Sequence, residues 1–227
     1  MPAPTVTMAT PRTMRKGELT RAAIVATALE MSARAGLEGL TIGALAERMR
    51  MSKSGVFAHF GSHEDLQIAV LKAYERRFVD DILVPALTEP RGLPRLRAIG
   101  ERWLERTAIE AARGCILISG ASEYDDRPGA VRDELVAMVR SWQRELARAI
   151  RQAVDTGALD PATDPGELVF ALYGIVLVLH HDTRLLHNPD AIGRARRAFE
   201  RLLDTHRAPS ARVRTPKPHE RSISSQN

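Results

Sequence analysis

Apolar residues recur at intervals of three and four along most of this chain, a spacing that is typical of amphipathic helices and not of strands. The most regular run lies on one face of the segment 131–153: Val131, Leu135, Met138, Trp142, Leu146, Ala149 and Ala153. Glycine, proline and N-capping residues separate the other runs. The pattern predicts an all-α protein of about nine helices, over residues 19–35, 41–49, 52–60, 62–83, 94–113, 115–124, 128–156, 165–186 and 189–205.

Breaks in this pattern divide the chain into units. Pro85, Pro90 and Gly92 interrupt the helical periodicity, and both termini lack periodicity and are rich in Pro, Thr, Ser and Arg. The N-terminal segment is open to two interpretations, a non-specific basic arm or sequence that precedes a true start at Met8 or Met14. The predicted organisation is a disordered arm at 1–17, an N-terminal helical unit at 18–84, a larger helical unit at 91–205 and a disordered basic tail at 206–227.

The segment 41–60 has the pattern of two short helices joined by a tight turn. Thr41 is a suitable N-cap for the first helix and Ser52 for the second, with the break at Arg50. The second helix would bury Val56 and Phe60 and point three polar side chains outward: Lys53, Ser54 and His59. A short cationic helix held across a partner helix can enter a DNA major groove and reach base edges. The segment therefore indicates a helix-turn-helix.

The same segment resembles the N-terminal region of the tetracycline-repressor (TetR) family of bacterial regulators. The resemblance covers about the first eighty residues and rests on Thr41, Ile42, Ala46, Glu47, Ser52, Lys53, Phe57, Ala58, His59, Phe60, Ser62, Glu64, Asp65 and Leu66. It implies an N-terminal three-helix DNA-binding domain and a C-terminal helical bundle for ligand binding and dimerisation. It further implies a homodimeric transcription regulator, most often a repressor, that binds a palindromic DNA operator and is released by a small-molecule effector.

Under this resemblance the DNA contacts fall on the two short helices and the start of the next one: Thr41, Ile42, Gly43, Ser52, Lys53, Ser54, Gly55, Phe57, His59 and His63. Lys53 is the best candidate for a guanine contact, and Gly55 would allow close approach of the backbone. Thr41, His59 and His63 would position the helices against phosphates.

Three residues depart from the family pattern. The turn usually contains glycine at positive φ, where a residue such as Arg50 costs roughly 1 kcal/mol, so we expect a turn of somewhat different build. Phe57 stands where a tyrosine hydroxyl commonly reaches a phosphate, and His63 stands where lysine is common. Because both changes weaken phosphate contacts, DNA affinity should depend more strongly on salt and pH than in relatives.

The distribution of charge also favours a polyanionic partner. The chain has a net charge of +5, made up of +4 over residues 1–60, −3 over 61–204 and +4 over 205–227. A basic N-terminal unit on a weakly acidic remainder suits DNA binding. The alternative is a solvated mixture of charges without a specific partner.

The helix expected at 165–186 is apolar around its whole circumference between Leu168 and Leu179. One side can pack on its own bundle, and the other needs a partner. The resembled family dimerises through its last two long helices, which implies an interface of Leu168, Leu172, Ile175, Leu179, Ala195, Phe199 and Leu202. The alternative is a central core helix in a monomer.

Aromatic residues of the C-terminal unit fall where the resembled family keeps an effector pocket: Trp103, Tyr124, Trp142, Phe170 and Tyr173. Each one taken alone is more simply core packing, but some of the set should line a cavity if one is present. Few charged residues share these faces, so we expect an apolar or amphipathic small molecule.

The sequence contains no pattern of a catalytic or metal site, and no cofactor is expected. Its histidines lack ligand spacing with a carboxylate or thiol at hand, and Cys115 beside Ile116 fits a small buried hydrophobe better than a reactive thiol. Phosphate loops and nucleophile elbows are missing from the sequence. Two rival classes remain, a small-molecule binding protein whose head no longer reads DNA and a metal- or thiol-dependent helical enzyme.

The expected location follows from three features. A single cysteine leaves no internal disulfide and fits a reducing compartment. No apolar stretch reaches the roughly 18 residues of a membrane span, and the N-terminus lacks the apolar core of a signal peptide. We therefore expect a cytoplasmic bacterial protein, associated with the nucleoid and without a membrane partner.

Overall fold

The computed structural model describes residues 16–209, so the sequence-based expectations for residues 1–15 and 210–227 lie outside the described part. Over this range the fold is all-α, as predicted, and its only β feature is an isolated bridge between Leu159 and Arg207. The elements are α1 (Lys16–Ala35), α2 (Ile42–Met49), α3 (Lys53–Phe57), α4 (His63–Phe78), a π-helical turn η1 (Val79–Leu83), α5 (Val84–Ala86), α6 (Leu93–Arg113), α7 (Ile116–Tyr124), α8 (Ala130–Asp155), α9 (Pro165–Arg184) and α10 (Ala191–Thr205).

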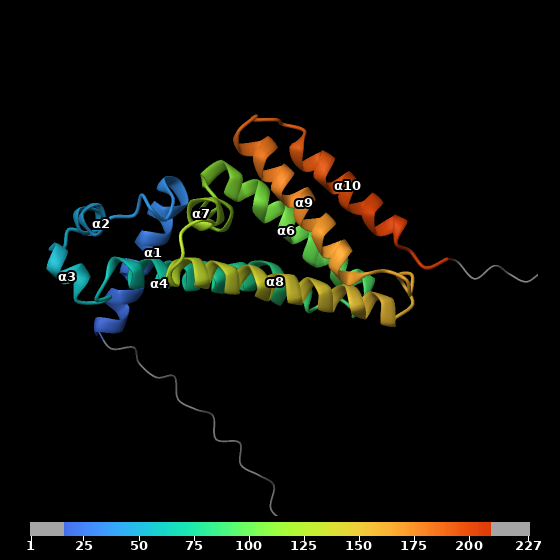
Figure 1. Cartoon of the computed structure of the whole chain (residues 1–227), viewed down its shortest axis with the longest axis horizontal. Coiled ribbons are helices and arrows are strands. Elements are labelled where there is room, and N and C mark those ends of the chain that lie inside the picture. Colours follow the sequence, from blue (N-terminus) through green and yellow to red (C-terminus); the bar gives the residue numbers. More distant parts are fainter. Residues whose placement is uncertain (1–15, 210–227) are drawn as a thin grey trace, which may run out of the picture.

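Helices α1, α2 and α3 form a small head at one end of the molecule, and α6 to α10 form the body (Figure 1). The predicted N-caps are confirmed, because Thr41 Oγ1 accepts from the Ala44 amide at 3.1 Å and Ser52 Oγ accepts from the Gly55 amide at 3.0 Å. Helix α3 is shorter than predicted. The amides of His59 and Phe60 bond to carbonyls three residues back, which tightens the chain into a turn and ends the α-helix at Phe57.

The turn between α2 and α3 keeps the left-handed conformation that the family commonly gives to glycine. Arg50 has φ 54° and ψ 42°, and its amide donates to the carbonyls of Ala46 and Glu47. The expectation of a differently built turn is therefore wrong. Arg50 adopts this conformation despite its steric cost, and the turn keeps its usual geometry.

We expect Arg50→Gly to stabilise the protein by about 0.5 kcal/mol, because relief of the left-handed strain exceeds the entropy that glycine adds to the unfolded chain. Urea unfolding of the two proteins measures the difference. Arg48→Gly is the control, since Arg48 lies in the last turn of α2 and glycine inside a helix destabilises by about 0.5–1 kcal/mol. Equal destabilisation by both changes would contradict the assignment of strain to Arg50.

A long helical segment connects head and body. The helix predicted at 62–83 is α4 followed by η1 and α5, so the chain stays helical through Ala86. Pro85 explains the π-helical turn, because proline has no amide to donate and its ring crowds the carbonyl four residues back. The ladder adjusts by one residue, and the Val84 amide donates to the carbonyl of Val79, five residues back.

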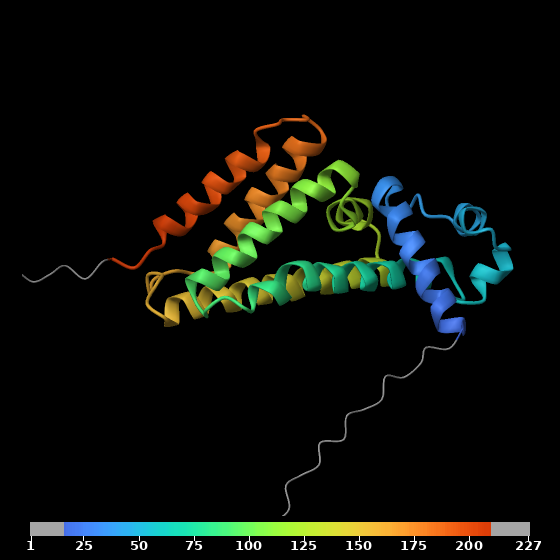
Figure 2. The same cartoon turned by 180° about the vertical axis from the view of Figure 1, so that it is seen from behind.

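The body consists of inclined helices stacked on this connecting segment. Helices α4 and α8 run side by side along the length of the molecule, α6 and α9 cross above them, and α10 covers the outer side of α6 and α9 (Figures 1 and 2). Contact between α6 and α10 is close, since a Cβ built on Gly100 would lie 2.1 Å from the Phe199 ring. No helix in the described range has both the length and the hydropathy needed to cross a bilayer.

The ordered structure extends beyond both predicted ends. Helix α1 begins at Lys16, so residues 16 and 17 belong to the helix and not to the arm. At the other end the Asp160 amide donates to the His206 carbonyl at 2.8 Å, and the Ala208 amide donates to the Ala158 carbonyl at 3.3 Å. These backbone bonds hold residues 206–209 against the loop after α8, which corrects the predicted start of the tail.

The head rests directly on the connection between α6 and α7 and on α7 itself. Gly114 has φ +109°, and a Cβ built on it would lie 1.4 Å from the carbonyl oxygen of Ala33 in α1. A Cβ on Gly120 would lie 2.9 Å from Leu37 Cδ1. Glycine therefore permits close approach of two chain segments that are far apart in sequence.

Candidate functional site

Helix α3 presents an exposed polar surface on an apolar anchor. Val56 and Phe60 are buried, as predicted, whereas Lys53, Ser54 and Phe57 are exposed. The Ser52 and Ser54 hydroxyls lie 3.2 Å apart, so the cap also orders the first turn of the helix. Helix α3 can thus meet a groove of DNA without losing its packing on α2.

The two glycines of the predicted DNA-contact set give close packing within the head. A Cβ built on Gly43 would lie 3.3 Å from Lys53 Cε, so the lysine stem passes over the start of α2. A Cβ built on Gly55 would lie 3.0 Å from Ser52 Oγ. Ile42 is half-buried beside them and packs on the core. Gly43 therefore positions Lys53, a role that its sequence context did not reveal.

The two histidines of the set are half-buried and have internal contacts. The His63 Nε2–H donates to the Leu40 carbonyl, which fixes the loop just before the Thr41 cap. The His59 ring meets the Phe60 ring at 6.5 Å in an edge arrangement. His63 therefore orders the head from within, and a phosphate contact at either histidine stays a prediction.

Tyr124 lies at the junction of head and body, apart from the other aromatic residues. Its hydroxyl donates to the Glu38 carboxylate and accepts from Gln67 Nε2 at 2.8 Å. The bond from Tyr124, together with Arg127 at 2.8 Å, lowers the pKa of Glu38, and burial raises the pKa of Tyr124. The assignment of Tyr124 to an effector pocket is corrected to a contact between α7 and the head.

Trp103, Trp142 and Tyr173 form a close-packed cluster in the body. Trp103 lies 5.3 Å from Trp142 and 5.0 Å from Tyr173, both edge-to-face, and Phe78 lies 4.8 Å from Trp142. The cavity beside Trp142 has a volume of only about 40 Å³. These rings fill the core and do not line a cavity of ligand size, so this part of the pocket prediction is also corrected.

Phe170 is 82% exposed on α9, so it cannot line an internal pocket. It begins a stripe of outward residues that continues through Gly174, Leu177, Val178, His181 and Leu185. The space beside Gly174 is open, because a Cβ built there would meet no described atom within 4 Å. Next to the end of this stripe lies a shallow hollow of about 830 Å³ lined partly by Leu177, His180 and Leu185.

The residues predicted for a dimer interface mostly face inward. Leu168, Leu172, Leu179, Ala195 and Phe199 are buried inside the protomer, where a partner cannot reach them. Ile175 and Leu202 are half-buried against the same core. The structure thus places these side chains against the protomer's own core, whereas the opposite face of α9 is apolar and exposed.

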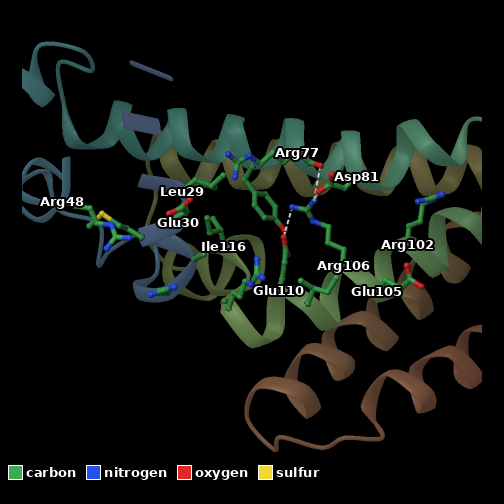
Figure 3. Close-up of a pocket in the computed structure, with 17 residues that line it drawn as sticks. Leu29, Glu30, Arg48, Arg77, Asp81, Arg102, Glu105, Arg106, Glu110 and Ile116 are labelled. Carbon is green, nitrogen blue, oxygen red and sulfur yellow. Dashed lines mark hydrogen bonds and ion pairs between the residues drawn. The ribbon is translucent and has the colours of Figure 1, made fainter. Parts of the chain in front are cut away.

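A separate cavity, of about 650 Å³, lies between α1, α4 and α6 (Figure 3). None of the five predicted aromatic residues lines it. Its inner wall contains Tyr74, whose hydroxyl donates to Glu110 at 2.8 Å, and Arg106, which pairs with Asp81 and with Glu110 at 2.8 Å. The pKa of Tyr74 is raised, mainly by burial and to a smaller extent by the nearby Cys115 and Glu110.

Cys115 is buried behind this wall, as predicted for a small hydrophobe. Burial and the neighbouring Glu110 raise its pKa to about 11, which keeps the thiol protonated at neutral pH. Among the described residues no group of three or more His, Cys, Asp or Glu side chains could hold a metal ion.

Together, a capped helix-turn-helix head and a separate helical body with a large cavity define a DNA-binding regulator. Sequence comparison gives the family. Residues 24–70 match the family of bacterial regulatory proteins of the tetR type, and residues 92–199 match the tetracyclin repressor-like C-terminal domain. The chain belongs to the TetR family and is a DNA-binding transcriptional regulator. The relatives reported below are transcriptional regulators.

Individual relatives agree with this assignment. The chain is 27% identical over 177 residues to the transcriptional regulator AcuR of Cereibacter sphaeroides, covering 72% of this chain and 79% of that protein. The TetR-family regulator of Cytophaga hutchinsonii has the same fold, with a TM-score of 0.75, 19% identity and coverage of 87% and 100%. AibR, solved with isovaleryl coenzyme A and operator DNA, superposes with a TM-score of 0.60, 24% identity and coverage of 83% and 98%.

Proposed function

We propose that this protein is a repressor that binds an inverted-repeat operator as a homodimer and is released by a small organic effector. The observation that carries the proposal is the exposed apolar stripe on α9, because a helix face of this kind needs a partner. A second copy, related by a two-fold axis, would cover the stripe and place two α3 helices to address two half-sites. The proposed units are the DNA-binding part at 18–84 and the regulatory and dimerising part at 91–205, acting in the bacterial cytoplasm.

The proposed interface consists of the outward face of α9, represented by Phe170, Gly174, Leu177, Val178 and Leu185. Gly174 has no side chain, so two helices can approach each other closely at the centre of the stripe. The half-buried Ile175 and Leu202 would lie at its border. The hollow beside Leu177 and Leu185 gives room for side chains of the second copy.

The proposed DNA contacts keep the ten residues of the sequence prediction, with Lys53 and Ser54 toward base edges and Thr41 and His59 toward phosphates. The intact caps and the left-handed turn at Arg50 favour this over a head that has lost DNA recognition. The effector would occupy the cavity between α1, α4 and α6, since α4 leads directly to the head. An effector that binds one head orientation more tightly by a few kcal/mol would then shift the population away from the DNA-binding state.

Selection of bound duplexes from a random pool tests the proposal, at about 150 mM salt so that non-specific phosphate attraction is damped. We expect enrichment of a palindrome with half-sites about one helical turn apart. A folded, dimeric protein that enriches no sequence would refute the regulator with an inverted-repeat operator.

We expect Lys53→Ala to relax base preference at one position of each half-site, with a loss of about 1–3 kcal/mol of discrimination. The exposed ammonium of Lys53 at the start of α3 is the basis for this expectation. Competition between the selected duplex and single-base variants measures the effect. Lys72→Ala on α4 removes the same charge away from α3 and is the control. Equal, sequence-independent weakening by both variants would contradict a base contact at Lys53.

A further inference from the structure

The cavity between α1, α4 and α6 is rich in arginine. Its lining contains six arginines and four carboxylates, which gives a formal surplus of two positive charges. The arginines are Arg34, Arg48, Arg77, Arg102, Arg106 and Arg113, and the carboxylates are Glu30, Asp81, Glu105 and Glu110. In Figure 3, Arg48 lies at one end of the cavity and Arg102 toward the other, with Arg77 and Arg106 between them.

Ion pairing makes the effective surplus larger than this count. Arg106 is paired with Asp81 and Glu110, and Glu105 is paired with Arg196 outside the lining at 2.7 Å. Within residues 16–209, the other five arginines of the lining form no ion pair, and Glu30 is the one carboxylate of the lining without a cationic partner. Several cations thus face one space with little internal compensation, which creates a positive potential in a partly enclosed site.

The buried ion pair forms the floor of this space and is not itself free to hold a ligand. The Arg106 side chain is 13% exposed, its guanidinium lies 5.3 Å from the ring centres of Tyr74 and Phe78, and its terminal nitrogens already bond to protein. The five unpaired arginines are exposed. An anion would therefore meet solvent-exposed guanidinium groups above a floor that is held by ion pairs and hydrogen bonds.

Most of the remaining lining is apolar and comes from α1, α6 and α7. Leu29 and Met31 from α1, Ile109 from α6 and Ile116 from α7 contribute carbon surface beside the arginines. The volume of about 650 Å³ lies within the range of small-molecule sites. An amphipathic anion would bury its chain on these residues and leave its head group among the guanidinium groups.

The arginines come from two parts of the molecule that both contribute to the wall of this cavity. Arg34 and Arg48 belong to the head, whereas Arg102 and Arg113 belong to α6 of the body. We propose that this cavity binds an organic oxyanion with a short apolar chain, a carboxylate or a phosphate ester, and that arginines of both head and body hold it. The inference rests on the proposed function, because this oxyanion would be the proposed effector, and it would join the head to the body.

Calorimetric titration of the full chain tests the proposal without DNA. Octanoate and octyl phosphate represent the two sources of the oxyanion, with 1-octanol and octyltrimethylammonium as neutral and cationic probes of the same chain. We expect at least one oxyanion to bind about tenfold or more tightly than octanol, and its affinity to fall with salt. The better oxyanion identifies the source. Equal affinity for octanoate, octyl phosphate and octanol, or no binding of either oxyanion, would overturn the proposal.

Paired substitutions test the two walls. Arg102→Gln with Arg113→Gln on α6, and separately Arg34→Gln on α1, should each lower oxyanion affinity about tenfold. These side chains are exposed and unpaired within the described range, so the variants should fold normally, which circular dichroism checks. Arg144→Gln removes an exposed arginine of α8 outside the lining and should leave affinity unchanged. If Arg34→Gln behaves like Arg144→Gln, the head does not hold the ligand and the bridging proposal is wrong.

DNA binding separates this inference from the proposed function. An enriched operator without oxyanion preference would refute the site and leave the regulator standing. Arginine-dependent oxyanion binding without an enriched operator would refute the regulator and leave the site. If Arg102→Gln with Arg113→Gln weakens DNA binding in the absence of any anion and reduces its salt dependence, these arginines contact phosphate backbone and the ligand site is refuted.

Discussion

Val178→Asp should convert the protein to a monomer and weaken palindromic operator binding by about 100-fold or more, because linked half-sites give an advantage of that order. Val178 is 61% exposed on the outward stripe of α9, away from its own core. In a two-fold interface the change would bury two carboxylates close together, which is costly without cationic partners. Sedimentation velocity measures the oligomeric state, and fluorescence anisotropy measures affinity for the operator.

Leu87→Asp is the matched control for this change. Leu87 is 53% exposed in the turn after α5, on a different surface from α9. It introduces the same charge at another exposed apolar residue, and it should leave both the mass and the operator affinity close to those of the unchanged protein. A Val178→Asp protein that still sediments as a dimer would show that the stripe on α9 is not the interface.

Gly114→Ala should destabilise the protein by about 3 kcal/mol or more, the scale of severe backbone strain and overlap. The added Cβ would lie 1.4 Å from the Ala33 carbonyl oxygen, and both groups belong to the backbone, so no side-chain rotation relieves the overlap. The residue also has φ +109°, where alanine is strained even in open space. We therefore expect the head to separate from the α6–α7 connection. Urea unfolding gives the loss, and hydrogen exchange over α1 locates it.

Gly157→Ala isolates the conformational part of this effect. Gly157 has φ +70°, and a Cβ there would meet nothing within 4 Å. Its substitution should therefore cost only about 1–2 kcal/mol. If Gly114→Ala and Gly157→Ala lower the free energy of unfolding by similar amounts, the overlap with Ala33 contributes nothing beyond the strain of a positive φ.

Local signals in the sequence predicted the head well. Thr41 and Ser52 are capping residues whose hydroxyl groups act on amides only three positions away, so their role is legible from spacing alone. The break at Arg50 was also predicted at the correct residue. The left-handed conformation of Arg50 was not predicted. Arginine does not favour this conformation by itself, so contacts elsewhere in the fold decide whether the turn adopts it.

Periodicity failed where a helix is apolar on every side. Along α9 it cannot tell whether Leu172 or Val178 faces the core, since both are apolar and only packing against α6, α8 and α10 decides. The large cavity was missed for a related reason. Its arginines are exposed residues of separate helices, and a single exposed arginine is ordinarily solvated. Arg34 and Arg102 are brought to one space only by the fold.

The edge-to-face pair of Trp103 and Trp142 has a consequence for spectroscopy. These are the two tryptophans of the chain, and both lie in the body. Tryptophan emission therefore reports on melting of the body, whereas far-ultraviolet circular dichroism follows the helices of head and body together. A head that melts first would reduce the circular dichroism signal before emission changes, so the separation of the two transitions measures how strongly the head and the body unfold as one cooperative unit.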